Sequence, residues 1–432
     1  MSNGGTHGSS VLFRGVRVFD GIASARSGPT DVLVTGSTIA SIGGEVAAAA
    51  PGEERVVIDG AGKTLMPGLI DAHWHAAFTG IGAFAALLAD PAYLHLIAGR
   101  EAGRTLDRGF TTVRDAGGPT FGLKAAIDEG VIAGPRIFPS GAFITQTSGH
   151  GDFRFTNDLS GNGCNHLHHI EANGVSAIAD GVPAVLQATR EQLMRGASQI
   201  KVMAGGGVSS AYDPIDVTQY TPAELRAAVE AAENWGTYVM VHAYTSRAVR
   251  QCIEAGVRCI EHGHLIEEDV VELMAERGTW WCLQPFLDDE DSDHFSAPDQ
   301  RAKHLQVVAG TDRAYELAIR HGVQLGWGTD ILFDPSKADR QGHMLTKLTR
   351  WFGAADILRL ATSGNAELLA LSGLRNPYPG RLGVVAEGAL ADLLLVDGDP
   401  LADLSVIEDP EHRFLVIMKD GQIHKNLAPS AA

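Results

Sequence analysis

Apolar and polar positions along the 432-residue chain follow two different patterns. At both ends, short β-branched runs are separated by glycine and aspartate, as in VLFRGVRVFDG (11–21), DVLVTGSTIASIGG (31–44), ADLLLVDGDP (391–400) and HRFLVIMKDGQIHKN (412–426). Such runs are typical of strands joined by tight turns. We therefore predict one small β-sandwich domain built from residues 11–66 and 376–432, preceded by a disordered N-terminal tail, 1–10.

The middle of the chain, residues 67–375, alternates strand-like runs with helix-like ones. The candidate strands are LIDAHWH (69–75), TTVRDAGG (111–118), RIFPSGAFI (136–144), QIKVMAGGG (199–207), YVMVHAYT (238–245), CIEHGHLI (259–266), WWCLQPF (280–286) and VQLGWGTDIL (323–332). Between them, stretches such as PAELRAAVEAAENWG (222–236) and SRAVRQCIEAG (246–256) have apolar residues at helical spacing. Eight βα units in series predict an α/β fold, a (β/α)8 TIM barrel, with a doubly wound open sheet as the alternative.

Chemically capable side chains collect near the C-terminal ends of these candidate strands. They are His75, Arg114, Asp115, Lys201, His242, His262 and Asp330. Barrel enzymes build their active sites at that end of the strands. In DAHWH (71–75), alternate side chains share a face, so His73 and His75 point one way and Trp74 the other. Such a pair can hold a metal ion, or be two ordinary polar residues at a strand end.

Bulk composition limits the partners. A formal net charge of −18 argues against nucleic acid or an anionic membrane as a binding partner. It does not limit the charge of the substrate, because a bound metal can reverse the local field. The N-terminus has no basic and apolar leader pattern, and no run of about 18 apolar residues occurs. We therefore expect a soluble, cytoplasmic protein. Cys164, Cys252, Cys259 and Cys282 lack CxxC spacing, which indicates reduced, mostly buried thiols.

Lys201 lies within a run that otherwise predicts a buried strand, where a charged amine pays a large desolvation cost. Three explanations are open: an ion pair with an internal carboxylate, a Schiff-base lysine, or an amine that has taken up CO₂ to become a metal-binding carbamate. His242 and His262, each taken alone, are typical of hydrogen-bonded structural histidines. Asp330 alone is typical of a turn or helix cap. With His73 and His75, however, they form a set of metal-ligand types at strand ends.

LMPGLIDAHWH, QIKVMAGGG, VMVHAYT, IEHGHLI and GWGTD resemble, in this order, the motifs of the metal-dependent amidohydrolase superfamily. GVVAEGALADLLLVDGDPLADL resembles the C-terminal part of its β-sandwich, so the resemblance covers about residues 11–425. It implies two divalent metal ions, one held by His73, His75 and Asp330, the other by His242 and His262, with N6-carboxylated Lys201 bridging both. Zinc is the default metal for such ligands, although manganese, cobalt or iron are compatible. Mononuclear deaminases of the superfamily lack this lysine, which argues against deamination.

The resemblance also implies the reaction, hydrolysis of an amide C–N bond. In this chemistry the metal ions lower the pKa of a water from about 15.7 toward 7, and Asp330 serves as general base and then general acid. ITQTSGHGD (144–152) and GGGVSSAYDPIDVTQYT (205–221) resemble a subgroup with Xaa-Pro and Xaa-Arg dipeptidases (prolidase-like carboxypeptidases) and ochratoxin-hydrolysing amidases. There, the residues matching His150 and Tyr220 reach toward the substrate; loop hydrogen bonding and plain packing are the alternatives.

The expected partner is a small-molecule substrate: a dipeptide, an N-acyl amino acid or an aromatic amide such as ochratoxin A. Trp74, Phe143, Phe286 and Trp327, near the strand ends, predict a pocket that tolerates aromatic groups. Other hypotheses are an esterase or lactonase, an aryl-carbamate or phenylurea hydrolase, a Schiff-base enzyme and a non-catalytic scaffold. Oligomerisation is common in the family, so a homo-oligomer is compatible with the chain. We predict that the acidic run LDDEDSD (287–293) is solvated and that the glycines at 205–207 belong to a mobile active-site loop.

Overall fold

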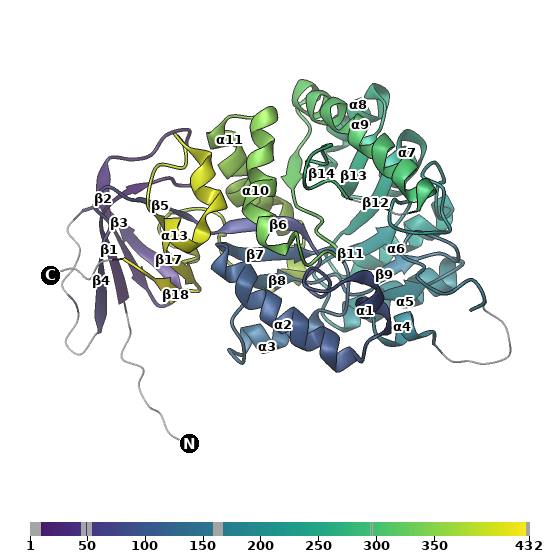
Figure 1. Ribbon diagram of the computed structural model, residues 1–432, viewed down its shortest axis with the longest axis horizontal. Coiled ribbons are helices and arrows are strands. Elements are labelled where there is room, and N and C mark those ends of the chain that lie inside the picture. The colour runs from purple at the N-terminus through teal and green to yellow at the C-terminus, as the bar shows by residue number, and fades with distance from the viewer. Residues whose placement is uncertain are drawn as a thin grey trace, which may run out of the picture.

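A computed structural model describes residues 10–44, 49, 54–158, 167–293, 295 and 297–428. It has a β-rich domain at one end and a barrel surrounded by helices at the other (Figure 1). Of the predicted tail, 1–10, all but Ser10 lies outside the described residues, and Ser10 begins the first strand. Within the described part of the chain, no helix is long and apolar enough to cross a membrane.

The β-rich domain contains one mixed sheet made from both ends of the chain. Its strands are β1 (Ser10–Val18), β2 (Pro29–Thr35), β3 (Thr38–Ile42), β4 (Arg55–Asp59), β5 (Thr64–Pro67), β16 (Leu393–Val396), β17 (Phe414–Lys419) and β18 (Gln422–Asn426). Their order is β18-β17-β16-β5-β1-β2-β3, with β4 also paired to β1. The antiparallel pairing of β16 with β5 joins the two ends of the chain. The domain limits at 66/67 and 375/376 remain a prediction.

The barrel strands are all parallel. Three form one sheet, β6 (Leu69–Trp74), β7 (Phe110–Asp115) and β8 (Arg136–Phe138). Seven form another, in the order β10 (Ser176–Ile178), β9 (Phe143–Thr145), β11 (Ile200–Met203), β12 (Val239–Thr245), β13 (Cys259–Leu265), β14 (Trp280–Leu283) and β15 (Leu325–Trp327). The third predicted strand, RIFPSGAFI, is divided between β8 and β9. The expected (β/α)8 barrel is therefore confirmed, and the β-sandwich domain expected from both chain ends is found as the β-rich domain.

The last barrel strand lies beside the first. The amide of Asn365 donates to the carbonyls of Ile70 in β6 and Trp327 in β15, both at 2.8 Å. The backbone N–H of Asp330 donates to the carbonyl of His73 at 2.9 Å. These contacts close the barrel and bring residues that are more than 250 positions apart in the sequence into one neighbourhood.

Helices follow the strands and cover the barrel (Figure 1). They are α1 (Ala83–Leu88), α2 (Pro91–Asp107), α3 (Phe121–Asp128), α4 (His169–Ala172), α5 (Val182–Met194), α6 (Pro222–Asn234), α7 (Ser246–Ala255), α8 (Glu268–Arg277), α9 (Pro298–His321), α10 (Gln341–Thr346), α11 (Ala354–Arg359) and α12 (Asn365–Ala370), with α13 (Pro410–Arg413) in the β-rich domain. The two predicted helices correspond to α6 and α7 and are confirmed.

The start of α6 illustrates how the sequence sets these boundaries. Thr221 accepts from the backbone of Glu224, whose carboxylate accepts in return from the backbone N–H of Thr221. This capping box and the proline at the first helical position favour a helix start at this point. Leu225, Val229 and Ala232 then recur on one face and are buried against the barrel strands.

Candidate metal centre and active site

Strand β12 shows how the barrel directs side chains into the site. Val239, Val241 and Ala243 point outward into the core shared with the helices, whereas Met240 belongs to the apolar cluster inside the barrel. Because strand side chains alternate, His242 continues the inner row past Met240. It emerges where the apolar interior ends, at the C-terminal end of the strand.

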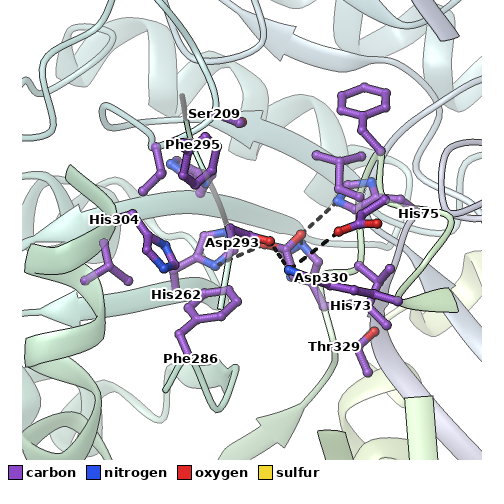
Figure 2. Close-up of a pocket in the computed structure, with 18 of the residues that line it drawn as sticks. His73, His75, Ser209, His262, Phe286, Asp293, Phe295, His304, Thr329 and Asp330 are labelled. Atoms are coloured by element: carbon purple, nitrogen blue, oxygen red, sulfur yellow. Dashed lines mark hydrogen bonds and ion pairs between the residues drawn. The ribbon is translucent and has the colours of Figure 1, made fainter. Parts of the chain in front are cut away.

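One cavity of about 470 Å³ lies at this end of the barrel and is lined by seven of the eight predicted site residues. They are His73, His75, His150, Lys201, His242, His262 and Asp330. In Figure 2, Asp330 lies between the pair His73 and His75 on one side and His262 on the other. Trp74 is buried in the core and does not line the cavity, as the alternation in DAHWH predicts.

The Asp330 carboxylate is the centre of this group. Its Oδ1 atom is 3.2 Å from Nε2 of His73 and 3.1 Å from Nε2 of His75, and its Oδ2 atom is 3.9 Å from Nδ1 of His262. Ligand atoms of His73, His262 and Asp330 all lie within 4.8 Å of one another. Burial alone would raise the pKa of Asp330, but the charge of His73 and the close contacts with the rings of His73 and His75 hold it well below its usual value. This carboxylate is therefore ionised at neutral pH.

Each of the four imidazoles uses one ring nitrogen to contact a protein acceptor. Nδ1 of His73 lies 2.6 Å from Oε2 of Glu261, and Nδ1 of His75 lies 3.2 Å from the carbonyl oxygen of Gly117. Nε2 of His242 lies 3.1 Å from the carbonyl oxygen of Gly206. Nδ1 of His262 lies 2.8 Å from Oε1 of Gln284. An acceptor requires a proton on the facing nitrogen, so the other nitrogen of a neutral ring keeps its lone pair. Histidines that bind metals are oriented by partners of this kind. The donor set fits a divalent metal site.

Lys201 extends from β11 into the same cavity and is 1% exposed. Among the described residues its amine has no hydrogen-bond or ion-pair partner, although Glu261 and Asp330 act on it through space. Burial is the largest influence and lowers the pKa of Lys201 below its usual value. A neutral amine is the form that reacts with CO₂, so the environment fits the predicted carbamate, whose oxygens would extend the donor set.

Two of the proposed ligands have a strained backbone. His262 and Asp330 have φ values of 73° and 56°, in the left-handed region that residues other than glycine rarely adopt. The conformation at Asp330 is supported by Asp71, which accepts from the backbone N–H and the hydroxyl of Thr329 and from the backbone N–H of His73. Strain of this kind persists where surrounding contacts impose it, and it occurs often at functional sites.

His150 comes from the loop after β9, and its ring stacks on His242 with 4.0 Å between centroids. Its Nδ1 atom lies 2.6 Å from Ser210 Oγ and 3.5 Å from Asp213 Oδ2. Burial would raise the pKa of Asp213, but interactions with His150 and Ser210 outweigh it and lower the pKa. Sequence reasoning missed Ser210 and Asp213, because neither stands in a recognisable ligand spacing.

Tyr220 does not line the cavity. Its side chain is buried, and its hydroxyl has no hydrogen-bond partner among the described residues. Burial raises the pKa of Tyr220, which keeps the phenol protonated. Tyr244 lines the cavity instead, two residues after His242 on the same face of β12, with its ring stacked 5.2 Å from that of His262. The period of two along YVMVHAYT was the signal that could have identified it.

Apolar side chains line the cavity on both sides of the candidate centre. Phe143, Phe153 and Phe333 lie in one apolar cluster, whereas Val307 lies in a second one with Phe286 packed against it. The predictions for Phe143 and Phe286 as pocket aromatics therefore hold. Those for Trp74 and Trp327 are wrong, because both side chains point into the core, where Trp327 stacks on Phe110.

The acidic run after β14 agrees with the prediction at Asp288, Glu290 and Asp293, which are exposed, but not at Asp291. Asp291 is not solvated, since its side chain is 3% exposed and pairs with Lys347 at 2.7 Å and with Arg340. Asp291 and Asp293 both line the cavity. Cys252, Cys259 and Cys282 are buried free thiols, as expected, and Cys164 lies outside the described residues.

Comparisons with known proteins agree with this architecture. A model of the amidohydrolase family matches residues 64–423. Ochratoxinase from Aspergillus niger is 31% identical over 376 residues, covering 84% of this chain and 75% of that protein. A solved prolidase complexed with N-methylphosphonate-L-proline superposes with a TM-score of 0.87 at 35% identity, covering 96% of this chain and 100% of that one. A Xaa-Pro dipeptidase with bound methionine superposes with a TM-score of 0.79 at 27% identity, covering 96% and 100%.

Proposed function

Because the chain belongs to the amidohydrolase family and is a hydrolase of C–N bonds, we propose that two divalent metal ions carry its chemistry. His73, His75 and Asp330 would hold one ion, His242 and His262 the other, and Lys201, carboxylated by CO₂, would contribute to both. Zinc is the expected metal, since the donor set offers imidazole and carboxylate without thiolate. The observation that supports this proposal is the convergence of all six side chains on one cavity.

Such ions, when bound, supply Lewis-acid polarisation of a carbonyl and a lowered pKa for water. Asp330 supplies the proton transfer in this proposal. It is ionised at neutral pH and lies in the cavity among the proposed ligands, so it can accept a proton from the attacking water. It can then return that proton to the departing nitrogen, which would otherwise leave as an unstable amide anion.

His150 is the proposed hydrogen-bonding group for the oxygen of the scissile carbonyl. Its Nδ1 is turned toward Ser210 and Asp213, and its Nε2 has no hydrogen-bond partner among the residues described. Tyr244 is a second such group, because it lines the cavity and its hydroxyl has no protein hydrogen bond in the described part of the chain. Donors placed where negative charge develops are worth about 10²–10³ in rate. A role for Tyr220 remains a prediction, and it would require the side chain to leave its buried position.

For the substrate, we propose an amide with apolar or aromatic groups on both sides of the scissile bond: a dipeptide, an N-acyl amino acid or an aromatic amide such as ochratoxin A. The apolar walls on either side of the candidate centre support this class. The similarity to a prolidase, a Xaa-Pro dipeptidase and ochratoxinase points in the same direction.

The test is turnover of purified protein on a panel of dipeptides, N-acyl amino acids and ochratoxin A, each with its matched ester, followed by mass spectrometry of the released products. We expect release of the free amine from aromatic amides, with Asp330→Asn slower by at least 100-fold. Faster cleavage of the esters than of every amide would favour an esterase. No cleavage of any amide by metal-loaded protein would contradict the proposal.

A further inference from the structure

The segment after β11, residues 204–221, forms one wall of the cavity and contacts His150. Ser210 and Asp213 both lie in this segment, and both face Nδ1 of the imidazole. One face of the ring stacks against His242. His150 is therefore held through the Nδ1 edge of its ring and through one ring face. Nε2 is the ring nitrogen without a protein partner among the described residues.

Asp213 is buried, with 2% exposure, although it is an acidic residue in a loop. Its Oδ2 atom accepts from the backbone N–H of Gly207 at 2.6 Å, which turns the segment back on itself. Its Oδ1 atom has no hydrogen-bond partner in the described part of the chain. A buried carboxylate lowers stability unless it is paired or hydrogen-bonded, and the groups that this one faces are Gly207, Ser210 and His150.

The glycines of this segment let the backbone approach closely. A Cβ atom at Gly207 would lie 2.0 Å from Nδ1 of His150, and one at Gly206 would lie 1.8 Å from the carbonyl oxygen of Pro214. Any side chain at these positions would displace the imidazole or the loop. The run GGG therefore gives the room in which His150 and Asp213 meet.

A buried lysine on α9 fastens the same segment. Lys303 is 8% exposed, and its ammonium donates to the carbonyls of Gly207 at 3.2 Å, Ser210 at 3.2 Å and Asp213 at 2.7 Å. One turn earlier, the amide of Gln300 donates to the carbonyl of Ser209 at 2.8 Å. Four hydrogen bonds thus attach the segment that carries Asp213 to a long helix, so the position of its carboxylate is well determined.

We propose that Asp213 is a positioning residue for the hydrolytic reaction: together with Ser210 it holds the imidazole of His150 in the orientation that presents Nε2 to the substrate, and α9 fixes it through Lys303. This inference rests on the proposed function, in which His150 contacts the substrate. Because Asp213 acts through His150, its contribution to the rate should disappear when the imidazole is absent.

The test is a double-mutant cycle with Asp213→Asn and His150→Ala, measured as kcat and KM on the best amide substrate. Asparagine keeps the size of the side chain and an acceptor for Gly207, so folding is least disturbed. We expect Asp213→Asn to lower kcat by about 10- to 100-fold with KM within about twofold, the loss typical of a misplaced catalytic group. In the His150→Ala background the same change should alter kcat by less than about twofold.

The matched control is Asp216→Asn, which changes an exposed aspartate of the same segment and should leave kcat unchanged. Metal content is measured in every variant and should equal that of the wild type. Equal losses from Asp213→Asn in both backgrounds would overturn the inference, because they would indicate a general structural role. An unchanged kcat in Asp213→Asn or in His150→Ala would also overturn it. Amide hydrolysis by the wild type would stand in either case, so the two failures are distinguishable.

Discussion

A buried ion pair between Arg114 and Glu261 lies next to His73 and contacts its imidazole ring. Arg114 donates to both oxygens of Glu261, at 2.7 and 2.9 Å, and to the carbonyl of Ala72 at 2.6 Å. Glu261 in turn accepts from Nδ1 of His73. Both members of the pair are fully buried. We predict that Arg114→Met, which keeps most of the side-chain volume, strongly destabilises the protein.

The magnitude follows from what the substitution leaves behind. Removing one partner of a buried pair costs about 3–5 kcal/mol, because the other charge stays buried without compensation. The unpaired carbonyl of Ala72 adds to this cost. We therefore expect a loss of about 4 kcal/mol, a large fraction of the 5–15 kcal/mol typical of a folded protein. In Arg114→Met with Glu261→Gln the pair leaves no unpaired charge behind, so this double variant should be more stable than Arg114→Met by about 2 kcal/mol.

The assay is equilibrium unfolding in urea, followed by tryptophan fluorescence with chelator present, so that metal binding does not contribute. Burial would raise the pKa of Glu261, but Arg114 and His73 hold it well below its ordinary value of 4.5. The contribution of the pair is then present above pH 4.5 and lost as the pH falls below it, so the substitution should cost more at pH 7 than at pH 4. A loss under 1 kcal/mol at pH 7, or a double variant no more stable than Arg114→Met, would refute the reasoning.

Three further predictions test other parts of the account. Lys303→Met should lower the free energy of unfolding in urea by about 2–4 kcal/mol, because three buried carbonyls lose their donor. An unchanged free energy of unfolding would mean that water replaces the ammonium. Tyr244→Phe should lower kcat by at least 10-fold. Tyr315→Phe, which removes a buried hydroxyl without a partner on α9, away from the cavity, should not; equal effects would exclude a specific role for Tyr244. Chelation should abolish amide hydrolysis, and added zinc should restore it. If activity survives complete metal removal and borohydride traps a substrate adduct on Lys201, the protein is instead a Schiff-base enzyme.

Several parts of the site could be predicted because they depend on local order along the chain. The alternation in DAHWH places His73 and His75 on one face and Trp74 on the other, whatever the rest of the fold does. A parallel barrel brings the C-terminal ends of its strands together, so His242, His262 and Asp330 converge once the barrel is recognised. The residues at strand ends were therefore accessible from sequence.

The remaining parts depend on contacts between distant segments. Glu261 orients His73 from 188 positions away, and Asp213 faces His150 across 63 positions, the difference between the two residue numbers. Neither residue has a local pattern that reveals its partner. Trp327 was misplaced for a related reason, because strand alternation gives two faces but does not say which one is the core. The acidic run at 287–293 looked solvated because Lys347 and Arg340, which neutralise Asp291, come from the segment after the next strand.

We propose that Lys201, once carboxylated, holds a pair of metal ions together with four histidines and Asp330. The most direct measurement is the metal content per chain, by inductively coupled plasma mass spectrometry, of the wild type and of Lys201→Ala purified in parallel with zinc and bicarbonate. We expect two metal ions per chain in the wild type and one or none in Lys201→Ala. A single ion in the wild type, or two ions retained without the lysine, would contradict it.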